Sequence, residues 1–171
     1  KKAPVSYDGE LVRNYGGGVC QLSSTLYNAA LLAGLAIVER HPHHWPARYA
    51  PIGRDAAVAH EEVDLRFRNS LPVPVRLSCS IEGEKLRCAV RAAYRPRCRV
   101  EVKTELVSVT RPAEVFQDQA RGPVRWKLTV RGHPGYHVVT YRKFFANGRT
   151  RREFISEDTY QPMNRLVRLL D

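Results

Sequence analysis

The chain has 171 residues, of which 43% are hydrophobic and 26% are charged, so it is long enough for one domain or two small ones and too apolar for an intrinsically disordered protein. The longest apolar stretch, residues 22–38, is interrupted by polar residues and is too short for a membrane span. The net charge of +11 is uneven, because residues 1–70 carry 8 Lys/Arg and 7 Asp/Glu whereas residues 71–171 carry 20 and 10. These cations are scattered and accompany no nucleic-acid motif, so we expect no nucleic-acid partner.

The first part of the chain predicts an extended start followed by one long helix. Residues 1–15 are expected to be extended, with a turn at Asp8-Gly9, and residues 16–18 are three glycines that permit a tight turn. The helix is predicted over residues 20–36, because apolar residues recur at helical spacing and Gly34 lies near the expected stop. Its predicted core face consists of Leu22, Leu26, Ala29, Ala33 and Ile37.

The remainder of the chain predicts strands. Residues 40–60 contain three prolines, which exclude a regular helix there. Period-two alternation then indicates strands near residues 64–69, 99–109 and 124–131. The predicted fold class is therefore α+β: one long N-terminal helix packed on an antiparallel sheet, with a β-rich C-terminal extension.

Residues 75–91 are predicted to form a hairpin around Gly83-Glu84, a pair that suits a type II′ turn. This register places Cys79 opposite Cys88 as a non-hydrogen-bonded pair, with Cα atoms about 4.5 Å apart. That spacing permits a disulfide, which we expect if the protein is exported. The cysteines are expected on the buried side of the hairpin with Leu77, Ile81, Leu86 and Val90.

Residues 132–160 are predicted to form a second hairpin, because Asn147-Gly148 is a strong signal for a type I′ turn. The implied register pairs two opposite charges with each other and two aromatic rings with each other, and both pairs support the predicted register. The two pairs are Arg142 with Glu153, and Tyr141 with Phe154.

Cys20 falls in the first turn of the predicted helix, where the positive end of the helix dipole lowers a thiol pKa and free N–H groups can bind an oxyanion. The residues expected on its face are Ser24, Tyr27 and Leu31. Papain-like and transglutaminase-like enzymes place a cysteine at a helix start, followed in sequence by His and Asp or Asn, and this chain has the order Cys20, His43, Asp55. The alternative is that Cys20 is a small buried apolar residue, but the preceding glycines favour a site with close backbone approach.

The sequence GGGVCQ at 16–21, Glu39-Arg40 before a histidine, and Gly53-Arg54-Asp55-Ala56 together resemble motifs of the VanW family. These are bacterial proteins often found with cell-wall functions and named for a glycopeptide-resistance cluster. The resemblance covers residues 1–91 and implies a cell-envelope setting more directly than a reaction. Because family members carry more sequence upstream, and the chain opens without methionine or signal peptide, we expect a trimmed piece of a longer protein.

The C-terminal hairpin resembles, more weakly, a glycine-motif bacterial surface repeat associated with wall glycan binding. The residues that carry this second resemblance are Pro134-Gly135, Thr140-Tyr141 and Asn147-Gly148. The two resemblances imply a division into a VanW-like core at 1–92, a connector with strands at 93–125, and a β-hairpin extension at 126–171.

The predicted catalytic residues are Cys20 as nucleophile, His43 as base and Asp55 as its orienting partner. His43 is preferred because the family motif places a histidine three residues after Arg40, and His41 and His44 are the alternatives. The predicted oxyanion and substrate contacts are Gly17, Gly18, Gln21, Ser24, Tyr27, Tyr49 and Arg54. The alternative roles are structural: a surface histidine at His43, a loop cap at Asp55, and packing or surface exposure at Tyr49 and Arg54.

Three functions fit these observations. The first is a cysteine hydrolase or acyl-transferase that acts on amide bonds of peptidoglycan peptides; the second is a non-catalytic module that binds wall glycan or an anionic wall polymer; the third is a structural partner domain. All three place the protein in the cell envelope or outside the cell, with any signal or membrane anchor outside this chain. No cofactor or metal is expected, because the four cysteines form no CxxC pair and the histidines at 41–44 lack further metal ligands nearby.

Overall fold

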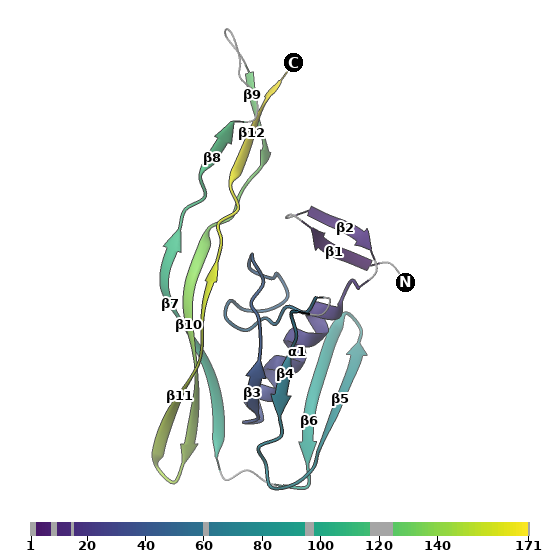
Figure 1. Ribbon diagram of the computed structural model, residues 1–171, viewed down its shortest axis with the longest axis vertical. Helices are drawn as coiled ribbons and strands as arrows, with labels where there is room; N and C mark the ends of the chain where they lie inside the picture. The colour runs from purple at the N-terminus through teal and green to yellow at the C-terminus, as the bar shows by residue number, and fades with distance from the viewer. Residues whose placement is uncertain are drawn as a thin grey trace.

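The computed structural model describes residues 3–7, 10–14, 16–59, 62–94, 98–116 and 125–170 and has an α+β architecture (Figure 1). In chain order its elements are β1 (Ala3–Tyr7), β2 (Glu10–Asn14), α1 (Val19–Leu32), β3 (Ala36–Glu39), β4 (Arg66–Arg68), β5 (Val75–Glu82), β6 (Lys85–Ala92), β7 (Arg99–Thr110), β8 (Glu114–Phe116), β9 (Arg125–Val130), β10 (Gly135–Ala146), β11 (Arg149–Tyr160) and β12 (Arg165–Leu170). The expected single antiparallel sheet is replaced, among these strands, by five small sheets: β1-β2, β3-β4, β5-β6, β11-β10-β7 and β8-β12-β9. The predicted Asp8-Gly9 turn lies outside the described residues.

Helix α1 begins and ends at glycines. Gly18 is the N-cap with a φ of 90°, a conformation that suits glycine, and its carbonyl accepts the N–H of Leu22. At the other end Gly34 has a φ of 77° and donates to Leu31, while Leu35 donates to Ala30, which is the Schellman pattern. The predicted extension of the helix to residue 36 is therefore wrong.

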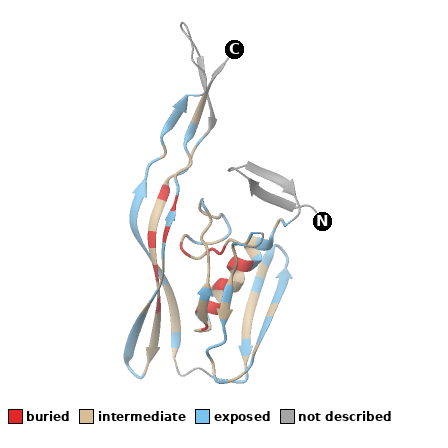
Figure 2. Ribbon diagram, viewed as in Figure 1, coloured by how far each residue is buried: buried red, intermediate tan, exposed pale blue. Residues whose placement is uncertain are grey.

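The buried face of α1 differs from the predicted one. Leu22 is 37% exposed, whereas the residues that the protein buries on α1 are Ser23, Ser24, Tyr27, Ala30 and Leu31 (Figure 2). The reason is hydrogen bonding: Ser23 Oγ donates to the carbonyl of Ala56 at 2.6 Å, and Ala56 N donates to Ser24 Oγ at 2.8 Å. The spacing of apolar residues did not predict this face, because two of its residues are serines. Their hydroxyls are hydrogen-bonded within the core.

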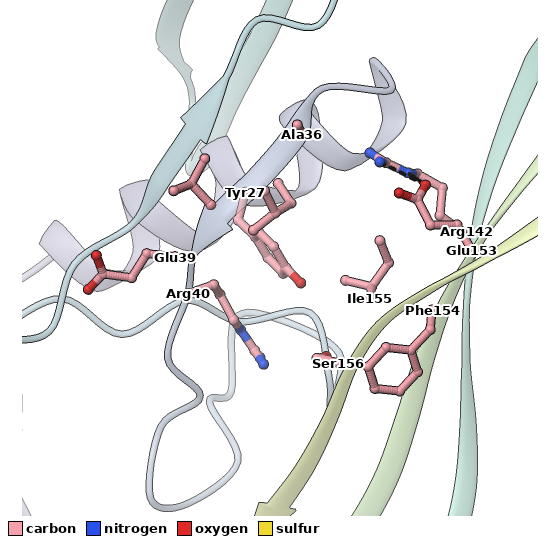
Figure 3. Close-up of a pocket in the computed structure, with 11 residues that line it drawn as sticks. Tyr27, Ala36, Glu39, Arg40, Arg142, Glu153, Phe154, Ile155 and Ser156 are labelled. Carbon is pink, nitrogen blue, oxygen red and sulfur yellow. Dashed lines mark hydrogen bonds and ion pairs between the residues drawn. The ribbon is translucent and has the colours of Figure 1, made fainter.

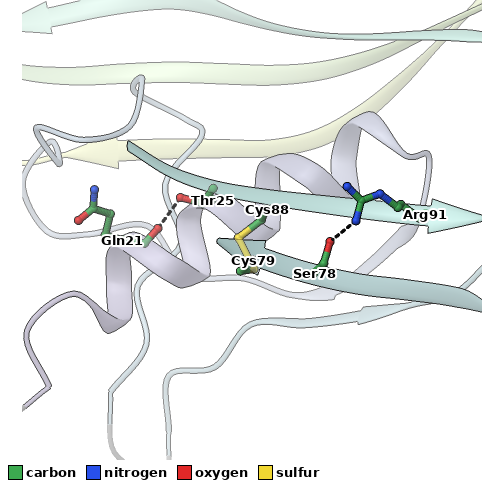
Figure 4. The surroundings of a disulfide bond; sticks show 6 residues. All are labelled: Gln21, Thr25, Ser78, Cys79, Cys88 and Arg91. Atoms are coloured by element: carbon green, nitrogen blue, oxygen red, sulfur yellow. Dashed lines mark hydrogen bonds between the residues drawn. A yellow bond between two sulfur atoms is a disulfide. The ribbon is translucent and has the colours of Figure 1, made fainter. Parts of the chain in front are cut away.

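The β5–β6 hairpin has the predicted register, with Cys79 opposite Cys88 and a disulfide between them (Figure 4). Their Cα atoms are 4.2 Å apart, as expected for a non-hydrogen-bonded pair. Gly83 at the turn has a φ of 61°, which fits glycine at the first central position of a type II′ turn. The expected burial is wrong for β5, because Leu77 is 45% and Ile81 is 77% exposed.

Strands β7, β10 and β11 form a long twisted antiparallel ribbon beside the helical part of the molecule (Figure 1). The predicted type I′ turn is confirmed, because Asn147 and Gly148 have φ values of 49° and 72°. The predicted pairs are also present, with Arg142 opposite Glu153 and Tyr141 opposite Phe154.

The ribbon meets the helical part through buried polar contacts. Arg142 is 3% exposed and donates to the carbonyls of Leu31 and Leu35 at the end of α1. Thr140 donates to the carbonyl of Gly53, where a side chain would collide with Thr140 itself. In the described part of the chain no helix is long and apolar enough to cross a membrane.

Candidate active site

Cys20 lies in the first turn of α1 and is partly buried. Its thiol lies 3.4 Å from the carbonyl oxygen of Val58. Among the described residues, the backbone N–H groups of Cys20 and Gln21 have no acceptor, as is usual in the first turn of a helix. The pKa of the Cys20 thiol is lowered, chiefly by a hydrogen bond with the His43 imidazole, which outweighs the opposing effect of burial.

His43 stands between Cys20 and Asp55. Its Nδ1 lies 2.5 Å from Asp55 Oδ2, and its backbone N–H donates to the same oxygen at 2.8 Å. Burial disfavours the charged imidazole, but the hydrogen bonds with Asp55 and Cys20 outweigh it and raise the pKa of His43 to about 9. A lowered thiol pKa beside a raised imidazole pKa shifts the balance from thiol and imidazole toward thiolate and imidazolium.

Asp55 is 1% exposed, and its carboxylate is fully occupied by donors. Oδ2 accepts from His43, while Oδ1 accepts from Arg40 Nη2 at 3.0 Å and from the Tyr160 hydroxyl. Burial raises the pKa of a carboxyl group, but the hydrogen bonds from His43 and Tyr160 and the charge of Arg40 hold the pKa of Asp55 below its usual range. Asp55 is therefore ionised and oriented toward Nδ1 of the imidazole.

The alternative bases lie elsewhere. His41 Nε2 is 3.0 Å from Glu39 Oε1, and the ring of His44 packs edge-to-face on Trp45. The loop of residues 40–56 thus turns only His43 of the three histidines toward both Cys20 and Asp55. In the described part of the chain no group of His, Cys, Asp and Glu has the arrangement of a metal site.

Tyr49 also contacts His43, with its hydroxyl 3.1 Å from Nε2. The side chain is 44% exposed, and burial together with the negative charges of Cys20 and Asp55 raises the pKa of Tyr49 to about 12, so the phenol is neutral. Beside Tyr49 lies a cavity of about 260 Å³ without charged lining residues. It is lined by Ser24, Thr25, Asn28, Tyr49, Ala50, Pro51 and Leu86. Neither Cys20 nor His43 lines this cavity, and Tyr49, whose hydroxyl contacts His43 Nε2, connects it to the predicted base.

The other predicted contacts fall into two groups. Gly17 and Gly18 precede α1, with Gly18 as its N-cap, and Gln21 follows Cys20 in the first turn. Arg54 is half-buried and donates from Nε to Asn28 Oδ1 at 2.6 Å, so it braces the loop against the helix.

Two of the predicted cleft residues are buried, although Ser24 also lines the cavity beside Tyr49. Ser24 is 1% exposed and its Oγ is held at Ala56. Tyr27 is fully buried and faces a different cavity of about 320 Å³, whose lining includes Arg40, Arg142 and Ser156 (Figure 3). The prediction that Tyr27 lines the cleft of Cys20 is therefore wrong, because the i+7 position from Cys20 turns into the core.

Three residues that the sequence reasoning missed complete the surroundings of Asp55. The side chain of Arg40 is 3% exposed and joins Asp55 to Asp158, with 2.5 Å between Nη1 and Asp158 Oδ1. Tyr160 is 1% exposed and binds both Asp55 and the N–H of Gly53. Arg40 carried a sequence signal as part of the Glu-Arg-His motif, whereas Asp158 and Tyr160 carried none, because their partners lie about a hundred residues away.

Comparison with known proteins gives two curated relatives. The chain is 48% identical over 83 residues to the Uncharacterized protein YoaR of Bacillus subtilis (strain 168), covering 48% of this chain and 27% of the relative. It is 24% identical over 119 residues to the Vancomycin B-type resistance protein VanW of Enterococcus faecalis (strain ATCC 700802 / V583), covering 67% of this chain and 43% of the relative. The chain thus spans less than half the length of either relative.

Two solved structures also match part of the chain. One is described as the IgA1 Protease G5 domain structure, with 26% identity, a TM-score of 0.27, and coverage of 43% of this chain and 92% of that one. The other is the crystal structure of HP0197-G5, with 17% identity, a TM-score of 0.26, and coverage of 42% and 92%. A family model described as VanW like protein matches residues 1–91, more than half of the sequence. The chain belongs to the VanW family.

Proposed function

We propose that this chain is a cysteine-dependent hydrolase or acyl-transferase of the cell envelope that acts on amide bonds of peptidoglycan peptides. The observation that carries the proposal is the row formed by Cys20, His43 and the buried carboxylate of Asp55, in which the thiol pKa is lowered and the imidazole pKa is raised. A buried polar row of this kind is costly unless its charges are paired, and perturbed pKa values of this type concentrate at functional sites.

In the proposed reaction the Cys20 thiolate attacks the carbonyl carbon of the amide and forms a C–S bond. The resulting oxyanion is stabilised by the free N–H groups of Cys20 and Gln21 at the positive end of the helix. Imidazolium at His43 then donates its Nε2 proton to the amide nitrogen, the C–N bond breaks, and a thioester remains. Neutral His43 next takes a proton from a water or an acceptor amine, which attacks the thioester and releases the thiolate.

Asp55 serves this cycle without touching the substrate. Its Oδ2 would hold the imidazole with the Nδ1 proton toward the carboxylate, so that Nε2 is left for the thiol. The neutral cavity beside Tyr49 would receive an uncharged part of the substrate, because it offers hydroxyl and amide groups but no ion pair.

The cell-envelope assignment follows from two features. The VanW relative is described as a resistance protein against vancomycin, and membership of its family supports a cell-wall setting. The Cys79–Cys88 disulfide fits an oxidising compartment outside the cytosol.

The proposal is tested by labelling Cys20 with iodoacetamide across pH 4–10. Cys98 is the other free cysteine among the described residues, so Cys98→Ser is the parent and Cys20→Ala is the variant. We expect Cys20 to be alkylated faster than an ordinary thiol at pH values below the usual thiol pKa. We also expect the parent alone to cleave or exchange amide bonds in purified muropeptides. Alkylation with the profile of a free thiol contradicts the proposal. Cys20→Ala should lower activity by about three orders of magnitude or more while the fold persists.

A second candidate function is binding of an anionic wall polymer by the C-terminal ribbon. Three arginines lie over aromatic rings near its turn: Arg99 over Phe145, Arg151 over Phe144 and Arg152 over Tyr141. Exposed cations beside aromatic rings suit an anionic glycan polymer. Sedimentation with purified cell walls should then decrease steeply as NaCl increases, because exposed charges are screened over about 10 Å at 0.1 M salt. Sedimentation that does not change with NaCl concentration would contradict binding through charge.

A further inference from the structure

The carboxylate of Asp55 is held from outside the segment that matches the VanW model. The match ends at residue 91, but Tyr160 at the end of β11 places its hydroxyl on Asp55 Oδ1. The neighbouring Asp158 binds Arg40, which is the other donor to Oδ1. Two residues of the C-terminal ribbon therefore contact the polar groups next to His43: Tyr160 binds Asp55, and Asp158 binds Arg40.

The hydroxyl of Tyr160 makes two buried hydrogen bonds with fixed directions, and Arg40 Nη2 donates to the same oxygen at 3.5 Å. It accepts the backbone N–H of Gly53 at 2.8 Å and donates its proton to Asp55 Oδ1. Burial and the negative charge of Asp55 raise the pKa of Tyr160, so the phenol keeps that proton across the physiological range. The hydroxyl thus links the loop on one side of Asp55 to the carboxylate itself.

The two oxygens of Asp55 consequently have separate tasks. Oδ1 is tied to Arg40 and Tyr160, and Oδ2 is left to His43 alone. If Tyr160 lost its hydroxyl, the remaining donor to Oδ1 would be the charged guanidinium of Arg40. The carboxylate could then turn toward this charge and withdraw Oδ2 from the imidazole.

We propose that Tyr160 is a positioning residue for the site, which sets the orientation of Asp55 against His43 and makes the C-terminal ribbon part of the catalytic unit. This inference rests on the proposed function. It assigns to β11 a role beyond wall binding, because the hairpin completes the polar row that residues 1–91 begin. The ribbon is then required for the hydrogen bond between Asp55 and the His43 imidazole as well as for a stable fold.

The test uses the full chain with isotopically labelled histidine and follows the His43 ring by NMR titration. Tyr160→Phe removes the hydroxyl and keeps the buried ring, and Tyr141→Phe on β10 is the matched control, since Tyr141 contacts Phe154 and Arg152 through its ring. We expect the His43 pKa, about 9 in the parent, to be lower by about one unit in Tyr160→Phe. In Tyr141→Phe it should be unchanged.

The outcomes separate the two proposals. A His43 pKa in Tyr160→Phe that equals or exceeds the parent value, with Cys20 still reactive in the parent, overturns the positioning role and leaves the proposed function standing. A parent in which Cys20 alkylates as an ordinary thiol overturns the proposed function instead. If Tyr160→Phe does not fold, Asp158→Asn replaces it, because Arg40 without its Asp158 charge should draw Asp55 away from His43 and lower the same pKa. An unchanged pKa in that variant also overturns the inference.

Discussion

The hairpins β5–β6 and β10–β11 have equally clear turn residues, yet the molecule uses them differently. In β5–β6 no residue is fully buried, and the strands are joined by the Cys79–Cys88 disulfide. In β10–β11 the buried residues include Thr140, Arg142 and Tyr160, which bind backbone or side-chain groups of the helical part. Local turn chemistry therefore determines how a hairpin pairs, whereas buried polar partners join β10–β11 to Asp55; β6 instead contributes Leu86 to the cavity beside Tyr49.

The largest stability effect that follows from this contrast is expected at Arg40. Replacing Arg40 with alanine leaves Asp55 and Asp158 buried without their shared cation, which should lower the free energy of unfolding by about 3–5 kcal/mol. Arg66 is the matched control, because its guanidinium is exposed and also bridges two acids, Glu39 and Asp64. Urea unfolding should show a much smaller change for Arg66→Ala. Equal effects of the two substitutions would contradict the buried linkage between the ribbon and Asp55.

The same contrast explains how much of the molecule the sequence could predict. Both registers followed from Gly83-Glu84 and Asn147-Gly148, because a two-residue turn fixes the pairs next to it as far as the first bulge, which in β10–β11 lies between Thr140 and Tyr141. The end of α1 was placed too late, since the apolar spacing continued past Gly34 into residues that form β3. Spacing alone could not tell a helix from a strand there, but the glycine could.

The candidate site was predictable only in part. The sequence brought forward Cys20, His43 and Asp55, which are close in sequence and belong to recognisable motifs. The alternative, that Asp55 caps its own loop, is not what the geometry displays, because its carboxylate accepts from His43, Arg40 and Tyr160. Tyr160 could not be found, since a single tyrosine at the end of a strand carries no pattern that reveals a partner 105 residues away.

Removal of the Cys79–Cys88 disulfide tests whether the β5–β6 hairpin influences His43 and Cys20. Its sequence separation of 9 residues closes a short loop, so replacing Cys79 and Cys88 with serine should lower the free energy of unfolding by about 2–3 kcal/mol. Because no described hydrogen bond joins β5 or β6 to the polar row, the His43 pKa and the alkylation rate of Cys20 should stay unchanged. A shift in either would show that the β5–β6 hairpin also controls the site, and would remove the distinction between the two hairpins.

The smallest expected effect concerns the pH dependence of stability, which tests whether Asp55 alone can hold a charged His43. Cys20→Ser is the background, so that no thiol titrates with the imidazole, and His43→Gln supplies a side chain that stays neutral at every pH. The pKa of His43 is raised above its unfolded value of about 6.5. Its protonated form therefore stabilises the fold fully below about pH 6.5, and this contribution is lost as the pH rises through the folded value, which is lower than in the parent because Cys20 also raises it.

In that background the difference in unfolding free energy between Cys20→Ser and Cys20→Ser/His43→Gln should decrease by about 1–2 kcal/mol from pH 6 to pH 9.5. Urea unfolding at several pH values measures this difference. The same decrease is expected when both variants also carry Cys79→Ser and Cys88→Ser, which remove the disulfide of the β5–β6 hairpin. A difference that stays constant over this range would mean that Asp55 does not hold the charged imidazole. A difference that grows with pH would mean that the fold prefers neutral His43, because the desolvation of the ring then outweighs its hydrogen bond to the carboxylate.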